Sequence, residues 1–196
     1  MKIIMGLGNP GSEYAQNRHN LGFRCIDRLA KLYSITVKKT LCQSYTGEGS
    51  IEGNSIILVK PRTFVNLSGN AASCLMRKYK CEPSELIVVH DDLDLPAGRL
   101  RIRLGGKSGG HRGIRSIIAG TGCEEFTRVR IGISRPFHNH GGSYEETIVD
   151  YVLGDLSRDE EDLVSPVIES ACEAIKVLLT EGLEAAMNKY NKRGSV

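Results

Sequence analysis

A short apolar run, Leu86 to Val89, leads directly into the polar residues His90-Asp91-Asp92. An unbroken apolar run of this length predicts a strand buried on both faces, as in the centre of a parallel sheet. A second run, Lys2 to Met5, stops at Gly6 and predicts another buried strand. Ligands bind outside the carboxyl ends of such strands in open α/β sheets. The two runs therefore predict an α/β fold with a polar site at the ends of its central strands.

The rest of the chain alternates between helical and strand patterns. Helices are predicted over 21–33, 68–79 and about 111–119, and strands over 45–51, 55–59, 100–104 and 128–133. Ser157 with Glu160 forms a capping box, Pro166 suits a first helical turn after Ser165, and Gly182 ends the segment. The turn at 52–54 joins two strands as a hairpin, so the sheet should be mixed. We expect one α/β domain over residues 1–196, a twisted mixed sheet flanked by helices in three layers (α/β/α).

Composition excludes several classes of protein. Hydrophobic residues make up 40% and charged residues 25% of the chain, as in ordinary soluble domains. No apolar run approaches the roughly 20 residues of a membrane span. The apolar run before Gly6 is too short for a signal peptide. The six cysteines are scattered without a CxxC pair, so we expect reduced thiols and a cytoplasmic location, not a disulfide or zinc framework.

The segment Gly6 to Gly11 matches GxGxxG after a strand, the fingerprint of dinucleotide-binding proteins. That fingerprint also needs a helix that opens at the glycines and an acidic residue about 20 positions further on. Here 10–14 has the pattern of a loop, and Lys31 stands where the acid is expected. We therefore expect the glycines to make room for a substrate and its attacking water, and we expect no cofactor.

His19 lies in the polar stretch Asn17-Arg18-His19-Asn20 and is the candidate general base. A histidine base needs an acceptor on its other ring nitrogen, and Asp91 or Asp92 can supply one. A structural histidine, and carboxylates that only cap helices, are the alternatives. The chain has no Gly-x-Ser-x-Gly elbow and no cysteine in a cationic, glycine-rich setting. A histidine–carboxylate pair without a nucleophile fits direct attack by an activated water.

Asn66 and a group of histidines each allow more than one interpretation. Asn66 is either a helix N-cap or an amide that holds a peptide-like substrate or a water. His138 and His140 could chelate a metal with His90 and Asp91, but their spacing matches no common pattern, so we expect no metal.

Positive charge gathers in one interval of the chain. Asp and Glu are absent from Arg99 through Cys123, which contains Lys107 and several arginines beside a glycine-rich loop. One-signed charge beside a glycine loop and a helix start suits a partner that carries phosphate. The net charge of +3 permits a nucleic-acid partner without requiring one.

Taken together, the motifs closely resemble bacterial-type peptidyl-tRNA hydrolases. The matching blocks, in order, are Gly6-Leu7-Gly8-Asn9-Pro10-Gly11 with Tyr14, Arg18-His19-Asn20, Lys60-Pro61 with Thr63-Phe64 and Asn66, His90-Asp91-Asp92-Leu93-Asp94-Leu95-Pro96, Gly109-Gly110-His111, and Arg130-Ile131-Gly132-Ile133. These blocks span most of the chain. The resemblance implies hydrolysis of the ester between a peptide and the 3′ end of tRNA by a monomer without metal or cofactor.

The resemblance also implies roles for individual residues. His19 would be the general base and Asp91 the residue that orients it. Substrate contacts would come from Asn9, Tyr14, Phe64, Asn66, His111 and Arg112, and tRNA phosphate contacts from Arg103, Lys107 and Arg130. Arg112 stands where many members have asparagine, and we hypothesise that it contacts tRNA phosphate instead. Val65 replaces a common methionine. The rival class is a non-catalytic RNA-binding relative, which would bind peptidyl-tRNA without cleaving it.

Overall fold

A computed structural model describes residues 1–137 and 143–191. Its seven strands are β1 (Lys2–Gly6), β2 (Lys39–Leu41), β3 (Ser44–Ile51), β4 (Asn54–Pro61), β5 (Leu86–Asp92), β6 (Leu100–Leu104) and β7 (Thr127–Gly132). The α-helices are α1 (Leu21–Leu32), α2 (Ser68–Tyr79), α3 (Arg112–Thr121), α4 (Tyr144–Leu153), α5 (Arg158–Thr180) and α6 (Leu183–Tyr190). None of the helices in these ranges is long and apolar enough to cross a membrane.

One mixed sheet has the strand order β2-β3-β4-β1-β5-β7-β6. The inner strands β4, β1, β5 and β7 are parallel, whereas β2 and β3 form antiparallel pairs at one edge and β6 pairs antiparallel with β7 at the other. The two apolar runs of the sequence are thus the central neighbours β1 and β5, as their composition predicts. Strand β2 is short and mostly exposed, and the sequence pattern does not predict it.

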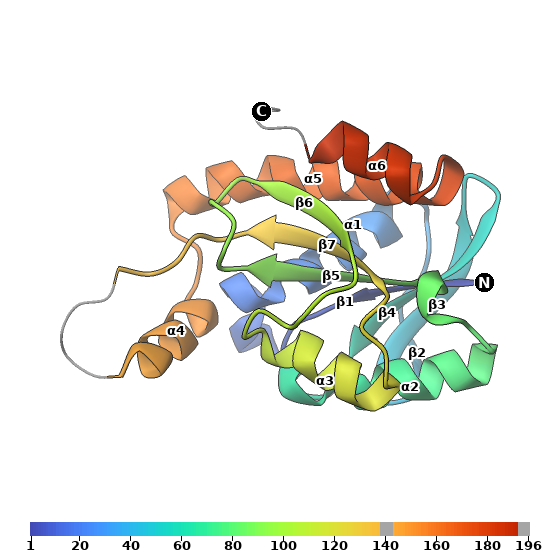
Figure 1. Cartoon of the computed structure of the whole chain (residues 1–196), viewed down its shortest axis with the longest axis horizontal. Helices are drawn as coiled ribbons and strands as arrows, with labels where there is room; N and C mark the ends of the chain where they lie inside the picture. Colours follow the sequence, from blue (N-terminus) through green and yellow to red (C-terminus); the bar gives the residue numbers. More distant parts are fainter. Residues whose placement is uncertain (138–142, 192–196) are drawn as a thin grey trace.

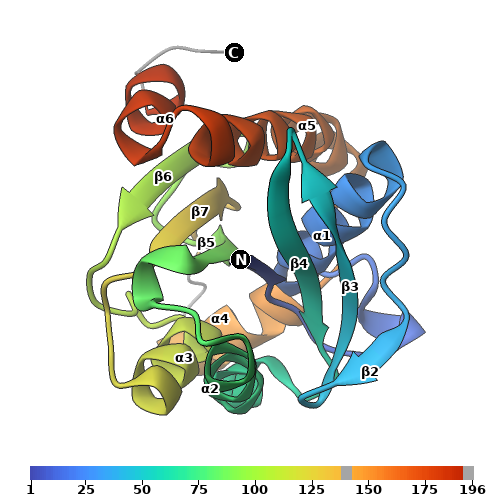
Figure 2. The same ribbon diagram turned by 90° about the vertical axis from the view of Figure 1, so that its right-hand side faces the viewer.

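Helices cover both faces of the sheet, and this confirms the three-layer architecture (Figures 1 and 2). Ile4 of β1 packs in a cluster with α1, α5 and α6, whereas its neighbours Ile3 and Met5 pack in a second cluster with α2 and α3. Alternate side chains of one strand therefore enter separate cores. Helix α4 lies beyond the carboxyl ends of β5 and β7 (Figure 1).

Three glycines allow α1 to pack closely against β1 and the loop that follows it. A Cβ on Gly22 would lie 2.4 Å from the backbone nitrogen of Leu7, and one on Gly6 would lie 2.2 Å from the Gly22 oxygen. A Cβ on Gly8 would lie 2.8 Å from the Phe23 ring. Gly6 and Gly8, which the sequence analysis connects with substrate, are therefore required here by the close packing of α1. They place the residues just before α1 at the end of β1.

Two sequence predictions are wrong in detail. Pro166 lies inside α5 and not in a first helical turn, since the Ser157–Glu160 capping box starts one helix that continues to Thr180. Proline costs a hydrogen bond there, but the buried face with Val164, Val167 and Ile168 offsets that loss.

The expectation of six free thiols is also wrong for one pair. Cys42, in the turn after β2, forms a disulfide with Cys74 on α2, and their Cα atoms are 5.7 Å apart. Cys25, Cys81, Cys123 and Cys172 are free. The pairing partners are 32 residues apart in sequence, so only the packing of α2 beside the β2–β3 turn reveals them.

Candidate active site

A histidine–aspartate pair lies where the central strands end. His19 belongs to a short 3-10 turn, Arg18–Asn20, immediately before α1, and Asp91 is the penultimate residue of β5. The His19 Nδ1 atom is 2.8 Å from Asp91 Oδ1 and 3.0 Å from Oδ2. Both side chains are buried, with 7% of His19 and 2% of Asp91 exposed. The fold thus joins the two residues that the sequence predicts as base and orienting acid.

A second histidine contacts the same carboxylate. The His111 Nε2 atom is 3.1 Å from Asp91 Oδ1, and the His111 and His19 rings have centroids 4.8 Å apart. His111 is the N-cap residue of α3, where its Nδ1 atom accepts hydrogen bonds from the backbone N–H groups of Gly113 and Ile114. An accepting Nδ1 carries no proton, so the proton is on Nε2 and donates to Asp91.

These contacts also decide the tautomer of His19. The Asp91 carboxylate accepts only, so the His19 proton resides on Nδ1 and donates to it. The free lone pair is then on Nε2 of His19, the atom that a general base requires. His19 itself lines an open pocket together with Asn9, Asn66 and Asp91. The cluster therefore presents a basic nitrogen to a space that can admit a substrate.

Electrostatics adjust the basicity of this nitrogen. Burial alone would lower the pKa of His19, but the charge of Asp91 and the hydrogen bond to it outweigh burial and raise the pKa above its ordinary value. The positive charge of Arg112 acts in the opposite direction. Burial alone would raise the pKa of Asp91, yet its interactions with His19 and His111 hold that pKa well below the usual range. Asp91 is therefore a carboxylate at neutral pH.

His90 lies beneath this cluster and stays uncharged. Burial, and then the neighbouring His111, lower its pKa well below the ordinary value. Its Nδ1 atom donates to the backbone oxygen of Asp91 at 2.7 Å, and its ring meets the His111 ring edge-on with centroids 4.8 Å apart. The sequence analysis places His90 at the polar end of a buried strand and in a hypothetical metal set. The structure gives it a packing contact with His111 instead.

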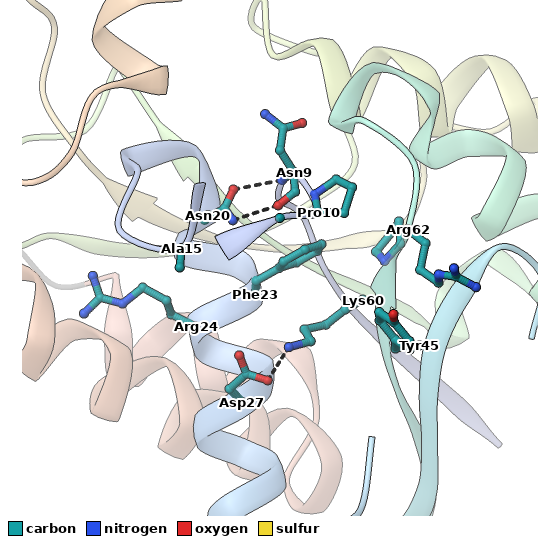
Figure 3. A pocket seen from close by; sticks show the side chains of 12 residues that line it. Asn9, Pro10, Ala15, Asn20, Phe23, Arg24, Asp27, Tyr45, Lys60 and Arg62 are labelled. Carbon is teal, nitrogen blue, oxygen red and sulfur yellow. Dashed lines mark hydrogen bonds and ion pairs between the residues drawn. The ribbon is translucent and has the colours of Figure 1, made fainter. Parts of the chain in front are cut away.

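Asn9 forms one wall of the site and is held from three sides. Its backbone N–H and C=O both bond to the side-chain amide of Asn20, at 2.8 and 2.9 Å (Figure 3). Its Oδ1 atom accepts from the backbone N–H of Val65 at 2.9 Å. The amide is thereby oriented, and its Nδ2 donor makes no hydrogen bond within residues 1–137 and 143–191. Asn20, whose role the sequence analysis missed, fixes this geometry.

Of the remaining predicted substrate contacts, Phe64 and Asn66 line the pocket, whereas Tyr14 does not line it and contacts Phe64. Asn66 lies in the 3-10 turn Val65–Leu67 and is exposed, and Leu67 is the N-cap of α2, so the alternative of an Asn66 cap is wrong. Phe64 is 56% exposed and packs edge-on against the ring of Tyr14, with centroids 6.4 Å apart. Phe64 and Asn66 line the same pocket as His19.

The pocket has a volume of about 600 Å³ and one apolar side. Residues of α4 supply that side: Ile148, Val149, Val152 and Leu153. Polar groups from the strand ends and the α3 N-terminus face it. A mostly apolar cleft with a few convergent polar groups is typical of an enzyme site.

The basic residues predicted to contact phosphate differ in their exposure and in whether they bond a carboxylate. Arg103 on β6 and Lys107 in the glycine-rich loop are exposed. Arg130 is mostly buried, and its Nε atom donates to Asp92 Oδ2 at 2.6 Å. Arg112 is exposed and donates to Glu145 Oε1 of α4 at 3.0 Å. Arg103 and Lys107 are therefore open to a ligand, whereas Arg112 and Arg130 already have carboxylate partners.

Arg128 on β7 has a structural role in the basic region. It is buried, and its guanidinium donates to the backbone oxygens of Lys107 and Gly106. These bonds attach the glycine-rich loop to β7. Arg128 thus holds Lys107 in place.

One group within residues 1–137 and 143–191 has the spacing of metal ligands. The nearest nitrogen and oxygen atoms of His19, Asp91 and His111 all lie within 4.8 Å of one another. Those atoms already form complementary hydrogen bonds, so the cluster is satisfied by its own members. His138 and His140 of the hypothetical metal set lie outside the described residues. The absence of a metal stays a prediction.

Comparison with known proteins identifies the family. The sequence profile described as peptidyl-tRNA hydrolase matches residues 3–195. The chain belongs to the peptidyl-tRNA hydrolase family. Peptidyl-tRNA hydrolases of Dehalococcoides mccartyi strain 195 and Carboxydothermus hydrogenoformans are 50% and 46% identical to it, over 97% and 99% of this chain and 100% of each relative.

Solved peptidyl-tRNA hydrolase structures agree with this assignment. The crystal structure from Acinetobacter baumannii is 38% identical, covers 97% of this chain and 94% of that one, and has a TM-score of 0.90. A peptidyl-tRNA hydrolase complexed with N-propanol has a TM-score of 0.92 at 37% identity and covers 100% and 97% of the two chains. Membership of the peptidyl-tRNA hydrolase family confirms the resemblance and removes the dinucleotide-binding alternative.

Proposed function

We propose that the His19–Asp91 pair hydrolyses the ester between the peptide and the 3′ end of tRNA in peptidyl-tRNA, and so recycles tRNA from aborted translation. The observation that carries the proposal is the hydrogen bond from His19 Nδ1 to Asp91, which leaves Nε2 as a base beside Asn9 and Asn66. Since its substrate arises during translation, we propose a cytoplasmic protein, and a monomer without metal or cofactor.

The proposed reaction needs one water, passes through a tetrahedral intermediate and forms no covalent bond between substrate and enzyme. His19 Nε2 takes a proton from the water as the water oxygen attacks the ester carbonyl carbon. The negative charge on the carbonyl oxygen is stabilised by N–H donors, for which the oriented amide of Asn9 and the exposed amide of Asn66 are candidates. The intermediate collapses when the ribose 3′ oxygen leaves and receives the proton from His19. The products are tRNA with a free 3′ hydroxyl and a peptide carboxylic acid, which loses its proton to solvent at neutral pH.

The remaining proposed contacts divide the substrate into two parts. Phe64 and His111, which line the His19 pocket, border the peptide ester, and Tyr14 supports Phe64 through the contact between their rings. The exposed Arg103 and Lys107 contact tRNA phosphates. Arg112 and Arg130 each bond a carboxylate, Glu145 and Asp92, through one guanidinium nitrogen, so a phosphate would share the guanidinium with that carboxylate. Their positive charge still adds to the local potential.

Purified protein incubated with a peptidyl-tRNA should release free tRNA, resolved from intact substrate on an acidic gel. KM should rise with salt, since phosphate contacts release counterions from the nucleic acid. Binding without cleavage would support the rival, a non-catalytic RNA-binding protein. The assembled His19–Asp91–His111 cluster favours the enzyme.

The rate should depend on pH through His19. The neutral imidazole is the active form, and Asp91 raises its pKa. The value of kcat/KM should therefore fall as pH decreases through a pKa above the ordinary histidine value of about 6.5, and be constant above it. A pH–rate profile with a short peptidyl-tRNA measures this. A midpoint below the ordinary histidine value would contradict the proposed electrostatic role of Asp91.

A further inference from the structure

A second pocket, of about 390 Å³, borders the Asn9 loop and is lined by α1, β3 and β4 (Figure 3). Asn9 lines both pockets, and it is the one residue that they share. Phe23 and Asp27 of α1 form one wall of the second pocket, and Tyr45 of β3 and Lys60 of β4 face them. The two pockets therefore adjoin at Asn9.

The strand order gives the two pockets a direction. The catalytic pair lies at the ends of β1 and β5, in the middle of the sheet. The proposed tRNA contacts Arg103 and Lys107 lie on β6 and on the loop that follows it, at one edge. The second pocket is built on β4 and β3, on the opposite side of β1. The proposed tRNA contacts and the second pocket thus lie on opposite sides of the catalytic pair in the sheet, and a peptide that extends from the ester away from the tRNA runs toward the second pocket.

Two of the three basic side chains that line the second pocket form ion pairs, and the third, Arg62, has none within the described residues. Lys60 Nζ lies 2.5 Å from Asp27 Oδ1, and Arg24 pairs with Glu161 of α5. Arg62 lies with its guanidinium carbon 5.1 Å from the centre of the Tyr45 ring and has no carboxylate partner within residues 1–137 and 143–191. An incoming carboxylate would therefore find Arg62 available. Pro10 and the rings of Phe23 and Tyr45 offer apolar surface for the chain that carries it.

We propose that this pocket is a distal peptide subsite, which receives a residue of the peptide remote from the ester and favours an acidic side chain that pairs with Arg62. The proposal rests on the proposed function, because it assigns the direction of the peptide within the same substrate. Such a site gives the enzyme a preference among nascent peptides that depends on residues remote from the ester.

The test compares peptidyl-tRNAs that share one tRNA and one esterified residue and carry either Glu or Lys at the second, third or fourth residue from the ester. Wild-type kcat/KM should be about two- to five-fold higher with Glu at one of these positions, mainly through KM, as expected for an exposed ion pair. The variant Arg62→Gln should remove the preference, and Arg62→Glu should reverse it. The matched control Arg77→Glu, exposed on α2 and outside both pockets, should retain it.

Three results would overturn the proposal. Wild type could show no preference at any position, or the Glu/Lys ratio could persist in Arg62→Gln and Arg62→Glu. The third contrary result is that Arg62→Glu raises KM for N-acetylaminoacyl-tRNA, which lacks distal residues, by the same factor as for the Glu-containing peptidyl-tRNAs. This result would assign the pocket to nucleotides of the tRNA. Failure of the proposed function is distinguishable, because wild type would then hydrolyse neither the N-acetylaminoacyl-tRNA nor any longer substrate.

Discussion

His19→Ala is expected to lower kcat for peptidyl-tRNA hydrolysis by roughly 10²- to 10⁴-fold, the usual contribution of a positioned general base. The physical reason is that Nε2 of His19 is the accepting nitrogen that the Asp91 hydrogen bond leaves free. The other two histidines of the cluster cannot replace it, since His111 Nε2 donates to Asp91 and His90 is buried beneath them. Single-turnover kinetics with a defined peptidyl-tRNA measure the loss.

The affinity of His19→Ala for tRNA should stay close to that of wild type, because the exposed cations of the proposed tRNA surface lie toward another edge of the sheet. A filter-binding Kd measured beside the kinetics separates the two effects. Added imidazole should restore part of the rate by supplying a base in the vacated space. A variant that turned over substrate like wild type would remove His19 from the mechanism.

The sequence predicted those parts of the fold that depend on local patterns. The unbroken apolar runs became β1 and β5, the hairpin across 52–54 formed as β3 and β4, and the predicted helix over 68–79 is α2. These features depend on neighbours in the chain, and so periodicity and turn chemistry are sufficient to find them. The prediction that Pro166 lies in a first helical turn is wrong because the burial of one face of α5 outweighs the local helix-breaking effect of proline.

The site was predictable in part. Pairing of His19 with Asp91 follows from the rule that parallel strands deliver polar groups to one edge. The bond from His111 to Asp91 depends on where α3 docks, and the Asn20 clamp on Asn9 depends on how the loop folds back. The Cys42–Cys74 bond and the second pocket likewise bring together residues far apart in sequence. Such contacts have no signature in a single sequence.

Asp91→Asn is expected to lower kcat by up to about 10⁴-fold, which is the effect of the corresponding change in serine proteases. The substitution preserves shape but replaces an acceptor by a group that can also donate. An amide N–H facing Nδ1 of His19 stabilises the tautomer with its proton on Nε2, and that tautomer is no base. His111 also loses the carboxylate to which it donates. Steady-state kinetics and a thermal unfolding midpoint would be measured together.

The pH profile of the residual activity distinguishes this positioning role from a merely structural one. Without the Asp91 charge, burial dominates the pKa of His19, so the acid limb of kcat/KM should move to lower pH than in wild type. The control Asp162→Asn, on an exposed position of α5 outside both pockets, should retain both the rate and the wild-type limb. If Asp91→Asn were slow but its kcat/KM profile kept the wild-type acid limb, Asp91 would support only the fold, and other groups would set the pKa of His19.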